Sequence, residues 1–310
     1  MDDERVALWT KVRAYMLGAA LYLPEEWLTD VARERARIPK TVRFQEKWRQ
    51  ALTLLREVRA SGFTVTGVLA DAEFGDVGLF RAFLHRLRLA YAVGISSNVT
   101  VFLGAPDLVW RTRNSRGRPR KHPELVGAVK AIPVSTVMAT TRKRWQHVSW
   151  RHRRDTRRWT VKCAALRVTP AHDWRHRRLA PEVWLLIEQD VGDTPKNKYS
   201  LVNLPATATL QQIVRFAHQR WAIEQQYQEL KTELGLDHFE GRTFPGWHHH
   251  VVLTAITYNF LQAERYRSGM TLTFPAVRAI IQEIFTAYLF AQQPRYLRRI
   301  EMLRSVHLRI

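Results

Sequence analysis

Residues 209–242, TLQQIVRFAHQRWAIEQQYQELKTELGLDHFEGR, predict one long amphipathic helix, and this helix constrains the fold more than any other stretch. Arg220, Glu224 and Lys231 follow one another at i, i+4 and i+11, so their side chains share one stripe of the helix. A rigid helix that presents a carboxylate between two cations suits a metal ligand beside phosphate groups. The alternative is a surface ion pair between Arg220 and Glu224, which is the commoner role of such spacing.

The N-terminal third of the chain alternates between strand and helix patterns. Strands are expected at 12–24, 63–70 and 90–95, and helices at 41–60 and 77–87. A strand, helix, strand progression favours an α/β fold with at least one parallel pair of strands.

The middle of the chain differs in composition and divides the sequence into three segments. Residues 97–205 contain a Pro/Gly/Arg loop, RTRNSRGRPRKHPEL, followed by short Trp- and Val-rich runs typical of antiparallel strands. We therefore expect a partial α/β core over 1–96, a basic β-rich insertion over 97–205, and the long helix with further helices over 206–310.

The net charge of +21 is concentrated in this insertion. Residues 111–178 hold 20 Lys and Arg against three acidic residues, which gives +17 in that span. Such a field suits a nucleic-acid backbone, and the loop residues Arg118, Arg120 and Lys121 are expected to contact it. Indole rings in the same span suit stacking on bases: Trp145, Trp150, Trp159 and Trp174. The alternative is a solvated basic surface with tryptophans packed in a local sheet.

Several other functional classes find little support. Cys163 is the only cysteine, so an internal disulfide and a Cys/His zinc site are excluded, and a reducing cytosol fits. The start of the chain lacks a signal-peptide pattern, and no apolar run is expected to span a bilayer. Consecutive helical residues point about 100° apart, so His248, His249 and His250 are not expected to converge on one ion.

A candidate acidic site follows the strand at 63–70. Asp71 comes directly after it, where α/β proteins place ligand-binding residues, and Glu73 and Asp76 are close in sequence. Strand transfer with paired Mg²⁺ needs carboxylates from separate elements, and Asp71 with Glu224 is one such pair. The alternative for Asp71 is a turn or helix cap.

Four motifs together resemble bacterial insertion-sequence transposases of the DDE class. They are ALYLPEEW, VLADAEFGD, RWAIEQQYQELKTELGLDHFEGR and GWHHH, in the family's order from about residue 13 onward. The resemblance implies an RNase-H-like core that cuts and joins transposon-end DNA with Mg²⁺, Mn²⁺ being an alternative. It also implies a homodimer on double-stranded DNA in the bacterial cytoplasm, at the nucleoid.

The same resemblance assigns roles to individual residues. Asp71 would be the second metal-binding acid and Glu224 the third, while Arg220 and Lys231 would contact phosphates near the cut. A Trp of the insertion would hold a flipped base, and Trp145, Trp150, Trp159, Trp174 and Trp184 are all candidates.

The chain departs from the family in two places. Ala217 stands where the signature has Tyr, and the first catalytic Asp has no counterpart, since Asp2 and Asp3 lie in no strand pattern. We therefore expect an N-terminally truncated transposase, inactive or impaired, whose core lacks its first strands. The strand at 12–24 would lose its neighbours, and the strand at 63–70 would be an open edge.

Two other functions stay open. A non-catalytic DNA-binding fragment, or an inhibitor of the intact transposase, is the main alternative. An RNA-binding protein is a third possibility, but the chain has none of the usual RNA-binding sequence patterns.

Overall fold

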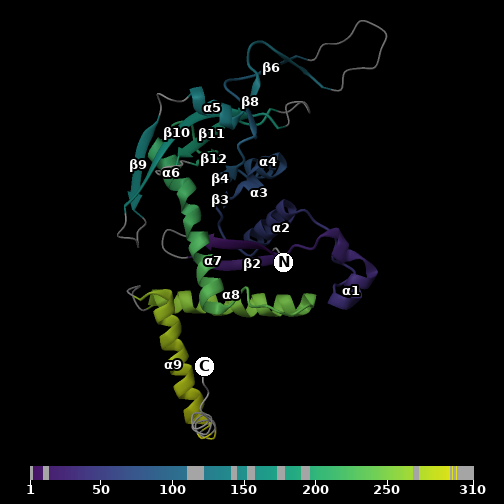
Figure 1. Cartoon of the computed structure of the whole chain (residues 1–310), viewed down its shortest axis with the longest axis vertical. Coiled ribbons are helices and arrows are strands. Elements are labelled where there is room, and N and C mark those ends of the chain that lie inside the picture. The colour runs from purple at the N-terminus through teal and green to yellow at the C-terminus, as the bar shows by residue number, and fades with distance from the viewer. Residues whose placement is uncertain are drawn as a thin grey trace. The chain divides into compact units, whose positions relative to one another are not determined.

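The computed structural model describes residues 3–9, 14–109, 122–140, 145–151, 158–172, 179–189, 196–267, 272–293, 295 and 298. Figure 1 shows the elements in chain order. The chain divides into two compact units: the first comprises Met1–Phe44 with Ala222–Ile310, and the second comprises Gln45–Trp221. The three segments expected from the sequence are defined by composition, whereas these two units are defined by contacts within the fold. The three segments therefore stay a prediction.

The second unit is built on one mixed sheet. Its strands are β3 (Gly67–Ala70), β4 (Ala90–Ile95), β5 (Thr100–Phe102), β8 (Ala131–Pro133), β9 (Gln146–Arg151), β10 (Arg158–Pro170), β11 (Val183–Gln189) and β12 (Asn197–Val202). Within the described residues the order is β3-β4-β12-β11-β10-β5-β8, and β9 also pairs with β10. The β3–β4 pair is parallel, as expected, and the strands of the insertion pair antiparallel. Strands of the insertion therefore extend the α/β sheet instead of forming a sheet of their own.

The remaining elements of the second unit flank this sheet. They are α2 (Lys47–Ala60), α3 (Ala72–Gly75), α4 (Gly78–Arg86), the β6–β7 hairpin (Asp107–Val109 and Glu124–Val126), α5 (Val134–Thr140), α6 (Leu210–Ala217) and the 3-10 turn η4 (His218–Arg220). The expected strand at 63–70 is shorter than predicted, and the helix expected from residue 41 begins at Lys47.

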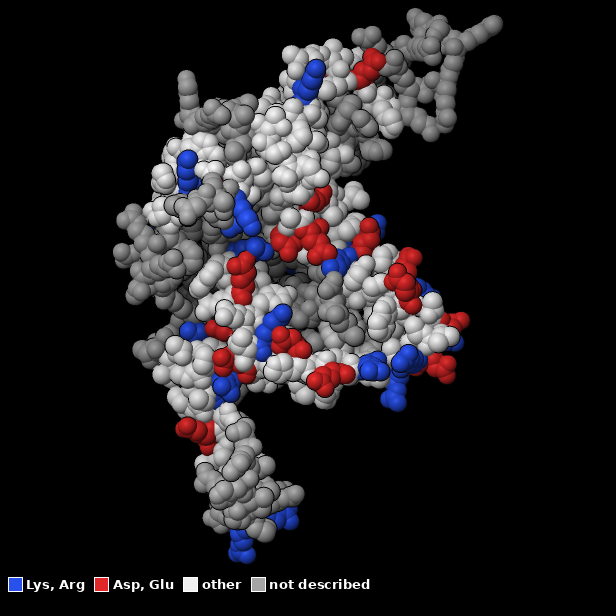
Figure 2. Space-filling model, in the orientation of Figure 1, with Lys and Arg blue, Asp and Glu red and all other residues white. Residues whose placement is uncertain are grey.

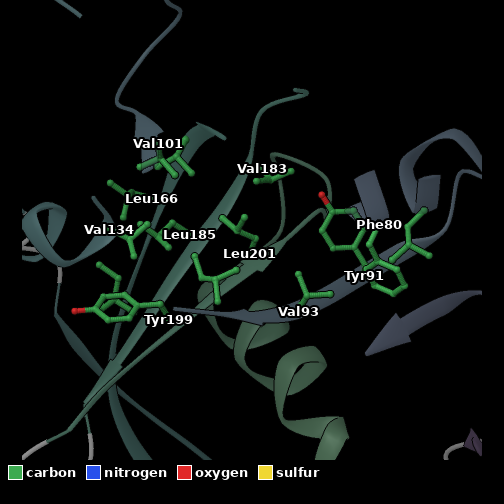
Figure 3. Close-up of a cluster of buried hydrophobic side chains, with 14 of the residues drawn as sticks. Phe80, Tyr91, Val93, Val101, Val134, Leu166, Val183, Leu185, Tyr199 and Leu201 are labelled. Atoms are coloured by element: carbon green, nitrogen blue, oxygen red, sulfur yellow. The ribbon is translucent and has the colours of Figure 1, made fainter. Parts of the chain in front are cut away.

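Alternating apolar residues of the central strands form the core of the second unit. Figure 3 shows Val93, Leu185 and Leu201, from β4, β11 and β12, pointing into one cluster with Phe80 of α4. Val93, Leu185 and Leu201 have no exposed surface. Burial of such side chains contributes about 1.5–3 kcal/mol each, so this cluster is the main source of stability for the sheet.

The first unit combines a hairpin with long helices. It contains β1 (Asp3–Trp9), β2 (Ala14–Leu21), the 3-10 turn η1 (Glu25–Leu28), α1 (Asp30–Ala36), α7 (Trp221–Leu234), α8 (Phe244–Arg267) and α9 (Phe274–Gln292). Its core includes Met16 from β2, Leu230 from α7 and Tyr258 from α8. Asn259 joins β2 to α8, because its side chain accepts from Met16 N at 2.9 Å and donates to Met16 O at 2.8 Å.

The hairpin corrects one expectation from the sequence. β1 pairs antiparallel with β2 over Asp3 to Trp9, so Asp3 begins a strand, and β2 has a neighbour after all. The open edge was expected correctly, since β3 pairs only with β4 among the described strands. The overall class, an α/β core with a β-rich insertion and C-terminal helices, is confirmed.

The helix expected over 209–242 is divided into three pieces. α6 begins with a capping box between Thr209 and Gln212, and the 3-10 turn η4 separates it from α7. α7 ends because Gly235 adopts φ +63 and donates to Lys231 O, a termination that glycine permits without strain. Arg220 lies in η4, so only Glu224 and Lys231 of the predicted stripe lie on α7 itself.

Two helices of the first unit expose apolar side chains. On α9, Phe285 and Tyr288 are each 63% exposed, and on α8, Ile256 is 60% exposed. Judged by length and composition alone, α9 could cross a membrane, contrary to our expectation for the apolar runs of this chain. Arg278 and Glu283 lie within it, and single helices of soluble proteins pass the same criterion.

Candidate functional site

Asp71 begins the turn that joins β3 to α3, at the carboxyl end of a strand. Its side chain accepts a hydrogen bond from Glu73 N at 3.1 Å and so caps α3, while its own carbonyl accepts from Gly75 N at 2.9 Å. The residue is exposed. The cap and the ligand role are compatible, because a carboxylate has a second oxygen.

Two glycines bring this turn close to the sheet. A Cβ on Gly75 would lie 1.7 Å from the Gly94 carbonyl oxygen, and a Cβ on Gly94 would lie 3.2 Å from Ala72 N. Only a residue without a side chain permits the approach at Gly75. The backbone of Asp71 therefore lies directly against β4.

A buried arginine fixes the far end of the same turn. Arg81 of α4 is 3% exposed, and its Nη1 donates to Gly75 O. Its Nη2 lies 3.0 Å from Nδ1 of His172, which follows β10. The sequence gives no signal for this contact, because Arg81 and His172 are 91 positions apart.

Acidic side chains gather around α3. Glu73 forms an ion pair with Lys47 at 2.7 Å, and Asp76 accepts from Ser96 N at 2.8 Å. Figure 2 shows Asp and Glu side chains clustered where Figure 1 places α3. Glu73 is thus neutralised by a lysine, whereas Asp71 and Asp76 each accept from a backbone N–H, and Asp71 is the one that directly follows β3.

The signature residues lie around η4 and α7. Glu224 and Lys231 are exposed, and Arg220 is half-buried. Just before Arg220, His218 Nε2 lies 2.6 Å from Glu188 Oε1 at the end of β11. This contact anchors η4 to the sheet of the second unit. Asp71 lies in the second unit and Glu224 in the first, so their convergence stays a prediction.

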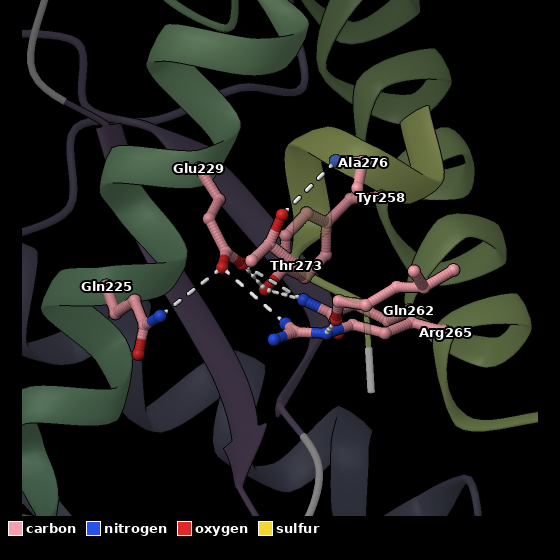
Figure 4. Close-up of polar contacts among 8 residues, drawn as sticks. Gln225, Glu229, Tyr258, Gln262, Arg265, Thr273 and Ala276 are labelled. Carbon is pink, nitrogen blue, oxygen red and sulfur yellow. Dashed lines mark hydrogen bonds and ion pairs between the residues drawn. The ribbon is translucent and has the colours of Figure 1, made fainter. Parts of the chain in front are cut away.

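The half-buried carboxylate of Glu229 holds α7 against α8. Glu229 Oε2 accepts from Tyr258 Oη and from Gln262 Nε2, both at 3.0 Å, and Arg265 Nη1 lies 3.8 Å from Glu229 Oε1 (Figure 4). Burial and the neighbouring Glu229 raise the pKa of Tyr258, so the phenol stays a donor. The network fixes the rotation of the helix that carries Glu224.

The predicted nucleic-acid contacts are described only in part. Trp145 is half-buried against the core of the second unit, and Lys162 Nζ lies 5.4 Å from its ring centroid. Trp159 lies in β10, and its partner in the antiparallel register is Trp150 of the neighbouring strand β9. Trp184 donates from Nε1 to Pro205 O. The remaining predicted contacts, Arg118, Arg120, Lys121 and Trp174, lie outside the described residues.

The three consecutive histidines of α8 do not meet at one point. His250 Nε2 lies 3.1 Å from Gly235 O, at the end of α7, whereas His248 Nδ1 lies 2.9 Å from Phe244 O. His249 is exposed. His248 and His250 thus contact different backbone carbonyls, and the absence of a metal role stays a prediction.

Hard oxygen ligands of the kind that Mg²⁺ and Mn²⁺ prefer are available at Asp71 and Glu224. In the described part of the chain, however, no group of three or more His, Cys, Asp or Glu could hold a metal ion. Each of these carboxylates suits a hard divalent ion by its chemistry, and two of them are fewer than two ions need.

The mixed sheet with a parallel strand pair and the C-terminal helices are consistent with an RNase-H-like DDE nuclease fold. Residues 5–157 match the family model described as DDE superfamily endonuclease. The match covers just under half of the chain, and it supports a DDE-class, transposase-like protein. Proteins of this kind act on DNA as nucleases or transposases and generally use divalent metals. No curated protein matches the chain.

Proposed function

We propose that the chain derives from an insertion-sequence transposase that cleaves and joins transposon-end DNA with Mg²⁺. Asp71 and Glu224 would hold the ion, and the chemistry it would supply is Lewis-acid activation of a phosphate and of the attacking oxygen. Arg220 and Lys231 would bind the adjacent phosphates, Arg through its fork and Lys as a point charge. The proposal includes a homodimer on DNA in the cytoplasm.

One observation carries this proposal: within the matched region, Asp71 is an exposed carboxylate at the carboxyl end of β3. An Asp in that position is held by the sheet on one side and open to substrate on the other. The glycine contact with β4 makes its backbone position rigid. These properties suit a metal ligand better than a solubilising surface charge.

The number of acids argues for low activity. Two-metal strand transfer needs about three protein carboxylates, and the described residues hold no such group. We therefore expect impaired catalysis. The same observation favours the second candidate, a DNA-binding protein without catalysis that occupies transposon ends or inhibits an intact enzyme.

A plasmid-nicking assay with Mg²⁺ or Mn²⁺ separates the two candidates. We expect little or no nicking, and any residual activity should be lost in Asp71→Asn and in Glu224→Gln. Asp107→Asn, in the exposed β6, is the matched control and should behave as the unaltered chain. Equal residual activity in Glu224→Gln would remove Glu224 from the proposed site.

DNA binding is tested separately by fluorescence anisotropy with a terminal-repeat duplex. A protein that contacts six to ten phosphates loses about 10³–10⁵ in affinity between 50 and 200 mM salt. An affinity that hardly changes with salt contradicts both candidates.

A further inference from the structure

We propose that Arg81 and His172 are positioning residues for Asp71, an inference that rests on the proposed metal-binding role of Asp71. The guanidinium of Arg81 joins the turn that begins with Asp71 to a histidine from the β-rich insertion. Neither residue touches the expected metal or DNA. Each acts through the backbone of the turn.

Arg81 contacts the turn at the carbonyl of the last residue of α3. Asp71 caps the first end of this short helix, and Gly75 is its last residue. Arg81 Nη1 donates to Gly75 O, so the guanidinium holds the opposite end of the same four-residue element. Because α3 is a single turn, a movement of Gly75 moves Asp71 as well.

His172 completes the arrangement from a distant part of the chain. Arginine can only donate, so His172 Nδ1, at 3.0 Å from Arg81 Nη2, accepts and its proton resides on Nε2. The imidazole lies over the start of α4, since a Cβ on Gly78 would be 1.8 Å from His172 Cδ2. Ala171 N donates to Thr100 O at 3.0 Å, which ties the backbone before His172 to β5.

Because Arg81 is buried, its position depends on each of its hydrogen-bond partners. Arg81 is 3% exposed, and a buried guanidinium needs acceptors for its N–H groups. Removal of the His172 imidazole takes away the acceptor that holds Nη2, so Nη1 of the same guanidinium is held less firmly on the Gly75 carbonyl. A metal ligand displaced by much more than about 0.5 Å no longer fits its ion well.

The test measures Mn²⁺ affinity by electron paramagnetic resonance on the full chain, together with melting temperature and metal-free DNA affinity. His172→Ala should weaken the Asp71-dependent Mn²⁺ site about tenfold or more, as supporting partners of metal ligands commonly do. DNA affinity in the presence of EDTA should not change. His85→Ala, an exposed histidine on α4, is the matched control and should leave all readouts unchanged.

Rescue distinguishes positioning from a general structural role. His172→Asn places an amide oxygen where Nδ1 lies and should restore Mn²⁺ affinity, whereas His172→Gln places it one bond further and should not. The Asn and Gln variants give the comparison even if His172→Ala does not fold. Equal loss in the Asn and Ala variants overturns the inference, and so does unchanged affinity in His172→Ala.

The Asp71→Asn variant separates this inference from the proposed function. If Asp71→Asn abolishes the Mn²⁺ site while His172→Ala leaves it intact, only the positioning inference fails. If Asp71→Asn leaves Mn²⁺ binding unchanged, the metal assignment fails and the inference fails with it.

Discussion

Gly75 approaches Gly94 so closely that a Cβ on Gly75 would lie 1.7 Å from the Gly94 carbonyl oxygen. The helical turn after Asp71 thus packs against the backbone of β4 with no side chain between them. The backbone position of Asp71 is therefore fixed by direct contact between this turn and the sheet.

Gly75→Ala should destabilise the protein, although alanine normally stabilises a helix. The new methyl group must displace backbone atoms, and overpacking of this kind costs about 1–3 kcal/mol or more. Urea denaturation followed by circular dichroism measures the loss. Gly94→Ala is the graded comparison and should cost less, because its Cβ would lie 3.2 Å from the nearest atom, Ala72 N. A Gly75→Ala chain as stable as the original would show that the turn does not pack as described.

Glu229→Gln should lower the free energy of unfolding by about 2–4 kcal/mol, because the buried Arg265 then faces a neutral amide in place of a carboxylate. Tyr258 and Gln262 would also lose a charged acceptor. The matched control is Glu264→Gln on α8, whose partner Arg267 is exposed, with an expected change below about 0.5 kcal/mol. Equal effects of the two substitutions would contradict a structural role for the Glu229 network.

Cys163 should resist alkylation in the folded protein. Burial, and secondarily the charge of Glu188, raise the pKa of this thiol from 9.0 to about 12. At pH 8 only about one molecule in ten thousand then carries the reactive thiolate. Folding favours the neutral thiol, so this contribution to stability is present below pH 9 and is lost as pH rises toward 12.

Mass spectrometry after iodoacetamide treatment measures the reaction of Cys163. A Ser61→Cys chain supplies an exposed thiol as internal control, which should react rapidly while Cys163 reacts only in denaturant. Comparable rates at the two positions in the folded chain would contradict the burial of Cys163.

Lys231→Ala should weaken DNA binding about equally for all sequences, since a phosphate contact carries no sequence information. Loss of one such contact should also reduce the salt slope by about one. Lys40→Ala, an exposed lysine after α1, is the control and should leave affinity and slope unchanged. A sequence-dependent loss in Lys231→Ala would indicate a base contact instead.

The elements of this fold follow from local sequence patterns. The apolar run of β4 and the helical periodicity of α4 depend on neighbours a few residues away, so the positions of both elements could be predicted closely. The position of Asp71 after a strand could be predicted for the same reason. The division of the long helix at η4 could not, because it depends on distant contacts such as that of His218 with Glu188.

Sequence alone determined the strand and helix pattern, the concentration of charge in the insertion, and the identity of the candidate acids. Tertiary structure decided that Asp3 begins a strand paired with β2, that the insertion continues the α/β sheet, and that Arg81 meets His172. The physical reason is the separation in sequence between the residues that interact. Backbone conformation and periodicity are set by adjacent residues, whereas strand pairing and buried hydrogen bonds join residues far apart in sequence, whose proximity only the folded chain creates.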